Sequence, residues 1–347
     1  MAIYLDSNVM YDWRTFAEAD RLALSVLGRE LEQPIIVPSL VAEELEASLR
    51  RRLSEASDEF DALSDKLNKL FQLDYVLTEP SLDVSLAVEP WRAALSEEFG
   101  SCDVTAEDTL LGLRREITGV PPARRTSPSK PGIGGRDAAI WLAIVRHHLS
   151  RDDNGFFITR DVRGFSAEGG LREELAADLA GCERPLTVFA SVEDLLTELG
   201  EKDDVEVDVA DIEPRVLELA RRGLIAARSL PRAVFYKDHA GLEFQTGIED
   251  GQVLRVIRAQ RFDGQFGEIL LVDCECRLRF RLRYRPLPSD PGDDTWFGVE
   301  DLDAKGRIQV YLGSTSDGQF IAAQLQPRQT MSLTEEGLVT WIELDWD

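Results

Sequence analysis

The pattern of hydrophobic and polar positions divides the chain into two parts with different periodicities. Up to about residue 200, short apolar runs alternate with longer segments in which apolar residues recur every three or four positions. The short runs are typical of buried strands, and the longer segments are typical of amphipathic helices. Strands joined by such long connections favour a parallel sheet. The first part is therefore predicted to be an α/β domain.

The predicted strands of this domain are the apolar runs at residues 2–5, 35–38, 155–159 and 186–189. Helices are predicted at residues 12–31, 40–74, 82–99, 105–118, 138–148, 171–179 and 192–199. Within this series, residues 46–118 form a helical insertion. A segment rich in Pro, Gly and Arg follows at 119–136, and a loop of this length inside a domain is usually functional or mobile.

From residue 211 onward the pattern changes to a period of two. After a helix at 214–229, strands separated by Gly, Asp and Pro turns are predicted at 234–236, 242–246, 253–257, 268–285, 308–312, 320–325 and 339–346. The strongly acidic segment 201–211 is predicted to be a linker. Residues 1–200 and 212–347 would then be separate domains, the second a mostly antiparallel sandwich or barrel preceded by a helix.

The strand predicted at 268–285 carries arginines on one face and apolar residues on the other, because successive side chains of a strand point to opposite faces. The arginines are Arg277, Arg279, Arg281, Arg283 and Arg285. This face would bind nucleic acid or a protein partner. The alternative is cross-strand pairing with the many acidic side chains of the chain.

The overall charge limits the classes of function. The 347 residues include 39 basic and 64 acidic side chains, a formal net charge of −25, which argues against binding nucleic acid by bulk attraction. A nuclease is still compatible with this charge, because bound metal ions offset a carboxylate cluster. Between residues 119 and 151 the balance reverses, with six basic residues against the single acid Asp137.

Cysteine and histidine usage and the hydropathy pattern exclude several other classes. The four cysteines have no zinc-like spacing and the three histidines are too few for a His-rich metal site, so we expect reduced thiols in a cytoplasmic protein. The N-terminal run is too short and too acidic for a signal peptide. No run approaches the ~18 apolar residues of a membrane span. We therefore expect no membrane association.

Four acids follow strands or begin helices of the first domain, namely Asp6, Glu44, Asp137 and Asp161. Because the carboxyl ends of parallel strands meet at one edge of the sheet, these acids can converge although they are far apart in the sequence. Clustered carboxylates raise one another's pKa, and a divalent cation removes that cost. Oxygen ligands favour Mg²⁺ or Mn²⁺ over Zn²⁺. Glu43 is adjacent to Glu44 and could be the ligand instead, but we prefer Glu44 because it precedes Leu45 and follows Val41 by three residues.

The sequences around these acids resemble those of PIN-domain nucleases. The resemblance rests on Leu-Asp-Ser-Asn at 5–8, Val-x-x-Glu-Leu at 41–45, Gly-Arg-Asp-Ala-Ala-Ile at 135–140 and Phe-Ile-Thr-Arg-Asp at 157–161. It covers about residues 1–200 and is greatest to larger PIN-like proteins with a helical insertion. It implies a three-layer α/β/α sandwich and cleavage, usually of RNA, with the metal held by Asp6, Glu44, Asp137 and Asp161. Ser7, Asn8 and Thr159 would support these ligands.

The sequence therefore favours a metal-dependent endoribonuclease with a C-terminal β domain for substrate or partner binding. Basic residues beside the predicted site would contact phosphates of the RNA, or of DNA as an alternative substrate; they are Arg124, Arg125, Lys130, Arg136 and Arg160. The competing hypothesis is a PIN-like module that binds RNA or protein without cleaving it. A phosphatase of the haloacid-dehalogenase type is excluded, because its second acid is replaced by Asn8. Whether the chain forms a homodimer is left open.

Overall fold

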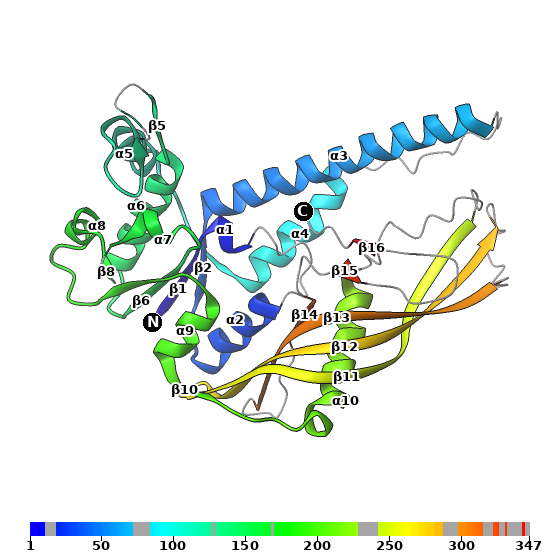
Figure 1. Ribbon diagram of the computed structural model, residues 1–347. Helices are drawn as coiled ribbons and strands as arrows, with labels where there is room; N and C mark the ends of the chain where they lie inside the picture. The colour runs from blue at the N-terminus through cyan, green and yellow to red at the C-terminus, as the bar shows by residue number, and fades with distance from the viewer. Residues whose placement is uncertain are drawn as a thin grey trace. The chain divides into compact units, whose positions relative to one another are not determined.

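The computed structural model describes residues 1–10, 19–71, 84–125, 127, 130–167, 170–227, 242–286, 298–314, 322–325, 330–331 and 342–343 (Figure 1). The chain divides into two compact units. The first comprises Met1–Asp12 and Glu32–Leu195, and the second comprises Trp13–Leu31 and Leu196–Asp347. Residues 13–31, which the sequence pattern assigns to the first domain, thus cluster with the C-terminal part of the chain.

A parallel sheet forms the centre of the first unit. Its five strands lie in the order β3 (Gly100–Cys102), β2 (Ile35–Pro38), β1 (Ala2–Leu5), β6 (Gly155–Ile158) and β9 (Leu186–Phe189). All neighbouring pairs are parallel. Every residue of β1, β2 and β6 is buried, as expected for continuous apolar runs covered on both faces. The predicted α/β fold with a central parallel sheet is confirmed.

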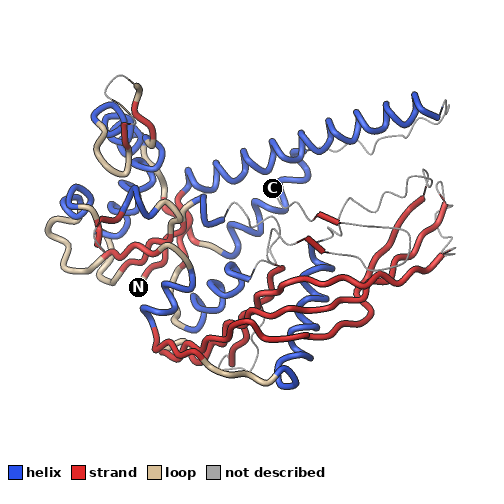
Figure 2. Tube along the Cα trace, in the orientation of Figure 1, coloured by secondary structure: helices blue, strands red, loops and turns tan. Residues whose placement is uncertain are grey.

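Helices surround this sheet, and Figure 2 shows them in blue around the red strands. They are α1 (Ser7–Met10), α3 (Ser39–Phe71), α4 (Val84–Glu98), α5 (Ala106–Thr118), α6 (Gly135–Leu149), α7 (Val162–Phe165), α8 (Glu173–Asp178) and α9 (Val192–Leu199). Apolar residues of α6 face the core, where the Trp141 ring packs against Phe157 and Phe165. This aromatic cluster anchors α6, and with it Asp137, to the sheet.

Helices α5 and α6 approach each other closely because the contact is made at a glycine. A Cβ atom added to Gly112 would lie 2.4 Å from the carbonyl oxygen of Gly135 and 2.8 Å from the amide nitrogen of Ala139. At its amino end, α5 is fixed by a capping box between Thr105 and Asp108. The first turns of α6 are therefore packed directly against the backbone of α5.

The basic segment 119–136 contains a short antiparallel hairpin of β4 (Arg124–Arg125) and β5 (Gly132–Ile133). It starts at Gly119, which ends α5 in the left-handed conformation with φ of 74°. The sequence predicted only a loop here, because two-residue strands are too short to show a period of two. A second small hairpin, β7 (Ser166–Ala167) and β8 (Gly170–Leu171), follows α7.

An antiparallel sheet forms the second unit, which confirms the change of architecture predicted from the sequence. Its strands lie in the order β10 (Gly200–Asp204), β11 (Leu242–Gly264), β12 (Gly267–Pro286), β13 (Gly298–Ser314) and β14 (Ala322–Leu325). Two helices, α2 (Ala19–Glu30) and α10 (Val209–Ala227), contact it. In the described part of the chain this is a single open sheet covered by helices, not the expected sandwich or barrel. Strands β15 (Thr330–Met331) and β16 (Ile342–Glu343) form a separate pair.

Several predicted boundaries differ from the structure. The expected linker at 201–211 begins instead with β10, which pairs with the end of β11. The strands predicted at 242–246 and 253–257 are one strand, because three register shifts let β11 continue beside the regular β12. The strand predicted at 234–236 lies outside the described residues. No described helix is long and apolar enough to cross a membrane.

Candidate active site

Asp6 lies at the carboxyl end of β1, and only 6% of the residue is exposed. Its Oδ2 atom accepts a hydrogen bond of 2.6 Å from the Thr159 hydroxyl, and its Oδ1 atom accepts one of 2.7 Å from the backbone N–H of Ser7. The pKa of Asp6 is raised from 3.8 to about 6: burial is the largest cause, the carboxylates of Asp137 and Glu44 add to it, and the hydrogen bonds from Thr159 and the Ser7 N–H oppose it. Asp6 is thus a carboxylate whose burial a cation would make less costly.

Thr159 connects Asp6 to the turn that follows β6. Besides donating to Asp6, the Thr159 hydroxyl accepts hydrogen bonds from Asn8 Nδ2 at 3.1 Å and from the backbone N–H of Asp161 at 3.2 Å. Asn8 Oδ1 in turn accepts the backbone N–H of Arg160 at 2.8 Å. The predicted supporting residues Asn8 and Thr159 therefore join the loop after β1 to the loop after β6, and they hold the two acids in a fixed relation.

The helix phase distinguishes Glu44 from Glu43. Residues Val41 and Leu45 of α3 are buried, which turns Glu44 inward and leaves Glu43 exposed. The Glu44 side chain is only 10% exposed, and its Oε1 atom lies 2.7 Å from Nη1 of Arg136. Its charge raises the pKa of both Asp6 and Asp137. Of the two candidate glutamates, Glu44 is therefore the one that lies beside the other acids.

Asp137 and Asp161 both lie next to helix starts, but neither acts as a helix cap. Asp137 is in the first turn of α6, whose N-cap is Gly134. Asp161 occupies the N-cap position of α7, yet its side chain makes no capping hydrogen bond. Burial raises the pKa of Asp137, and the carboxylates of Glu44 and Asp161 raise it further. Both carboxylates are thus left available to a ligand.

A pocket of about 340 Å³ opens beside these acids. Asp137 and Asp161 line it, together with the arginines Arg124 and Arg136. Pro122 and the glycine-rich run before α6 complete the wall. The side chains of the two arginines lower the pKa of Asp137. The pocket therefore combines carboxylates with guanidinium groups, as a site for a phosphate ester beside a cation would.

The other predicted basic residues are placed differently. Arg125 donates to the backbone carbonyl of Ile117, at the end of α5, and does not line the pocket. Lys130 is exposed and also lies outside the pocket lining. Arg160 is exposed in the turn after β6. Of the five basic residues predicted to contact the substrate, Arg124 and Arg136 therefore line the pocket, and the other three do not.

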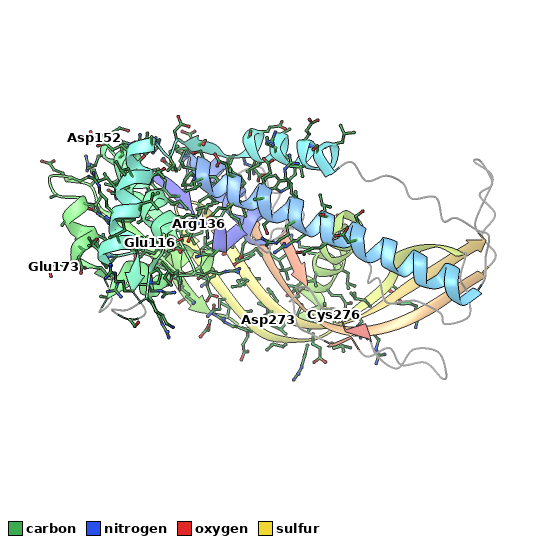
Figure 3. The ribbon with its side chains drawn as sticks, turned by 90° about the horizontal axis from the view of Figure 1, so that it is seen from above. Glu116, Arg136, Asp152, Glu173, Asp273 and Cys276 are labelled. Atoms are coloured by element: carbon green, nitrogen blue, oxygen red, sulfur yellow. The ribbon has the colours of Figure 1, made fainter. Side chains whose placement is uncertain are left out.

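Glu116 is a further acid in the pocket lining that the sequence did not indicate. Figure 3 labels it together with Arg136, which also lines the pocket. Its Oε2 atom accepts the backbone N–H of Gly135 at 2.7 Å, at the first residue of α6. In the sequence Glu116 is one of many charged residues on a helix. Only the tertiary packing of α5 on α6 brings it to the site, and the closest cue is the buried Gly112 one turn earlier on the same helix.

The donor set fits a divalent cation by its chemistry. All four candidate ligands are carboxylates, which suit Mg²⁺ and Mn²⁺. In the part of the chain that the structure describes, no three His, Cys, Asp or Glu side chains lie close enough to hold a metal ion as they are placed. Glu44 nevertheless lies near enough to raise the pKa of Asp6 and of Asp137, Asp161 lies near enough to raise the pKa of Asp137, and Glu44 is engaged by Arg136. A cation that bound Glu44 would have to displace the guanidinium of Arg136 from this carboxylate.

Comparison with known protein families gives a match for the N-terminal part of the chain. Residues 3–165 match a family model described as PIN domain. The matched range runs from β1 to α7 and contains all four acids and the residues that support them. No curated protein and no solved structure matches the chain.

Proposed function

Because residues 3–165 are a PIN domain, a family of typically metal-dependent nucleases, we propose that this protein is a metal-dependent endoribonuclease. The observation that supports the proposal is electrostatic proximity among four carboxylates from separate elements: Asp137 and Glu44 raise the pKa of Asp6, and Glu44 and Asp161 raise the pKa of Asp137. Asp6 follows β1 and Asp161 follows β6. Glu44 lies in α3, and Asp137 lies in the first turn of α6. Their mutual repulsion is what a bound Mg²⁺ or Mn²⁺ ion would relieve.

The residues of the chain have distinct roles in this proposal. The Thr159 hydroxyl and the Ser7 N–H fix the orientation of the Asp6 carboxylate, and Asn8 in turn fixes Thr159. When bound, the cation would lower the pKa of a water molecule and stabilise the charge on the phosphodiester. Asp137 and Asp161 present their carboxylates to the pocket in which the substrate would lie.

Substrate binding would use the two arginines of the pocket. Arg136 is 75% exposed and pairs with Glu44, so its guanidinium can exchange this carboxylate for a phosphate when a cation takes Glu44. Arg124 lies on the hairpin that forms the pocket wall. RNA is the substrate class that the family resemblance implies, and DNA is the second choice.

The decisive experiment is cleavage of a fluorescent single-stranded RNA in Mg²⁺, Mn²⁺ or a chelator. We expect cleavage only with the metals, and none from Asp6→Asn. Glu44→Gln and Glu43→Gln form a matched pair on adjacent residues, of which only the first should lose activity and Mn²⁺ affinity by calorimetry. Full cleavage by folded Asp6→Asn would refute the proposal.

A module that binds RNA without cleaving it is the second candidate. It is favoured by the ion pair between Arg136 and Glu44, which occupies one of the four carboxylates. This function predicts RNA binding that is equal with Mn²⁺ and with chelator, and no calorimetric signal for Mn²⁺. Metal-dependent cleavage would exclude it.

For the second unit we propose a role in binding substrate or a protein partner. The register of β12 places Arg279 opposite Asp303 and Asp250, whereas Arg277 lies opposite Lys305 and Gln252. Cross-strand pairing thus explains Arg279 better than Arg277. A pull-down comparing Arg277→Glu with Arg279→Glu would test this role, and we expect the first substitution to reduce partner capture more.

A further inference from the structure

The outer face of α5 carries a stripe of exposed apolar side chains. Leu110, Leu113 and Ile117 are 51%, 50% and 64% exposed, respectively. With Ala106, which is also exposed, they lie at alternating spacings of four and three residues. Single exposed apolar residues are ordinary, but a contiguous stripe of them marks an interaction surface.

The stripe is held rigidly, because the opposite face of α5 is fixed inside the first unit. Asp108 is buried, completes the capping box with Thr105 and forms an ion pair of 2.9 Å with Arg146 of α6. One turn further on, Gly112 packs against the backbone of α6. The outer face therefore cannot turn inward to bury its leucines. The stripe is therefore presented as a fixed surface to which a second molecule could bind.

Charges flank the stripe in a pattern that is complementary to itself. Glu107 and Arg114 are exposed and lie seven residues apart, on the same side of the stripe. Within the described part of the chain neither side chain forms an ion pair. In an antiparallel pairing of two such helices, Glu107 of one copy faces Arg114 of the other, and the twofold axis repeats the contact.

The apolar residues fit the same pairing. When Leu110 faces Leu113 of a second copy, the small Ala106 faces the large Ile117 at both ends of the stripe. Small residues opposite large ones are what interdigitated packing needs. We infer that this protein forms a homodimer through antiparallel pairing of the α5 stripe, defined by Ala106, Leu110, Leu113 and Ile117, with the same helix of a second copy.

The size of the stripe predicts a dimer of moderate affinity. A stable interface buries about 800 Å² on each partner, more than these four side chains expose, so the stripe can form only its centre. The charged pair would lie at the rim, where it sets the orientation more than the affinity. The dimer should therefore dissociate on dilution.

Sedimentation velocity of the full chain over a wide range of concentrations tests this inference. We expect a shift from monomer to dimer as the concentration rises, and a monomer throughout for Leu113→Glu. The matched control is Leu86→Glu on α4, because Leu86 is 63% exposed but lies outside the stripe. This control should dimerise as the unmodified protein does.

A charge exchange tests the orientation of the helices. Glu107→Arg and Arg114→Glu should each weaken the dimer by at least about tenfold, because each places like charges opposite one another twice. The double variant should restore the affinity of the unmodified protein. A monomer at every concentration, a dimer that survives Leu113→Glu, or a double variant no better than the singles would overturn the inference. None of these results depends on nuclease activity.

Discussion

Replacing Asp6 with Asn should make the fold more stable at neutral pH while abolishing cleavage. The pKa of Asp6 is about 6 in the fold against an ordinary value of 3.8, so the folded chain binds this proton more tightly than the unfolded chain. The stabilisation from proton binding is complete below the lower pKa and is lost as the pH rises through about 6. At neutral pH the ionised, buried carboxylate therefore destabilises the fold relative to a neutral side chain.

The magnitude follows from the same two pKa values. A rise from 3.8 to about 6 corresponds to about 3 kcal/mol, since one pKa unit is worth about 1.36 kcal/mol. Asn resembles the protonated carboxyl group, but its single oxygen can accept only one of the bonds that Thr159 and Ser7 donate. This loss offsets about 1 kcal/mol. Asp6→Asn should therefore stabilise the fold by about 2 kcal/mol at neutral pH.

Urea unfolding in the presence of a chelator, at neutral pH and at about pH 4, measures this difference. The advantage of Asp6→Asn should shrink toward zero at the lower pH. Asp152→Asn is the surface control, because the Asp152 side chain is 97% exposed, and its stability should not change. Adding Mn²⁺ should stabilise the unmodified protein but not Asp6→Asn. A variant that is less stable at both pH values would refute the reasoning.

Three further predictions concern the support of the site, the pocket and the packing behind it. Thr159→Val should lower the free energy of unfolding in urea by about 2 kcal/mol, because the hydroxyl makes three hydrogen bonds. The same substitution should weaken Mn²⁺ binding measured by calorimetry. Thr159→Ser keeps the hydroxyl and should leave stability and Mn²⁺ affinity as in the unmodified protein. Arg124→Gln should raise KM for RNA and make KM less dependent on salt concentration. Lys130→Gln, at a residue outside the pocket, should leave KM and its salt dependence unchanged. Equal effects of the two substitutions would contradict a role of Arg124 in binding phosphate. Gly112→Ala should lower the free energy of unfolding by about 1–3 kcal/mol, because the added Cβ atom meets backbone atoms of α6. Gly170→Ala is the control and should not lower it, because the added Cβ atom has open space. Equal losses of stability in the two variants would argue against this packing.

The fold of the first unit was largely predictable because its strands are buried on both faces. Continuous apolar runs located β1, β2, β6 and β9 to within a residue. Strand β3 was not predicted, because it is a three-residue edge strand that includes Gly100 and is mostly exposed. In the second unit, bulges hid the continuity of β11, since each shift of register breaks the period of two. Local sequence also could not show that residues 13–31 cluster with the second unit, because that depends on tertiary contacts.

The candidate site was predictable to the extent that position along a strand or helix determines where a side chain lies. Asp6 and Asp161 follow directly from the ends of β1 and β6. The spacing to Val41 and Leu45 already favoured Glu44 over Glu43 in the sequence, and the burial of both apolar residues gives this preference a physical reason, because it fixes the rotation of α3. Glu116 could not be found in this way, because its place at the pocket depends on how two helices pack.

The reversal of charge between residues 119 and 151 looks in the sequence like a binding surface for nucleic acid, but the fold uses much of it internally. Arg146 pairs with Asp108, Arg151 pairs with Asp153, and Arg125 donates to a backbone carbonyl. Only Arg124 and Arg136 of this group line the pocket. A strongly acidic protein with two guanidinium groups beside its carboxylates cannot hold a long stretch of RNA by charge. Within the first unit, substrate recognition would then be confined to the phosphates next to the bond that is cut, where the bound cation would supply the remaining positive charge.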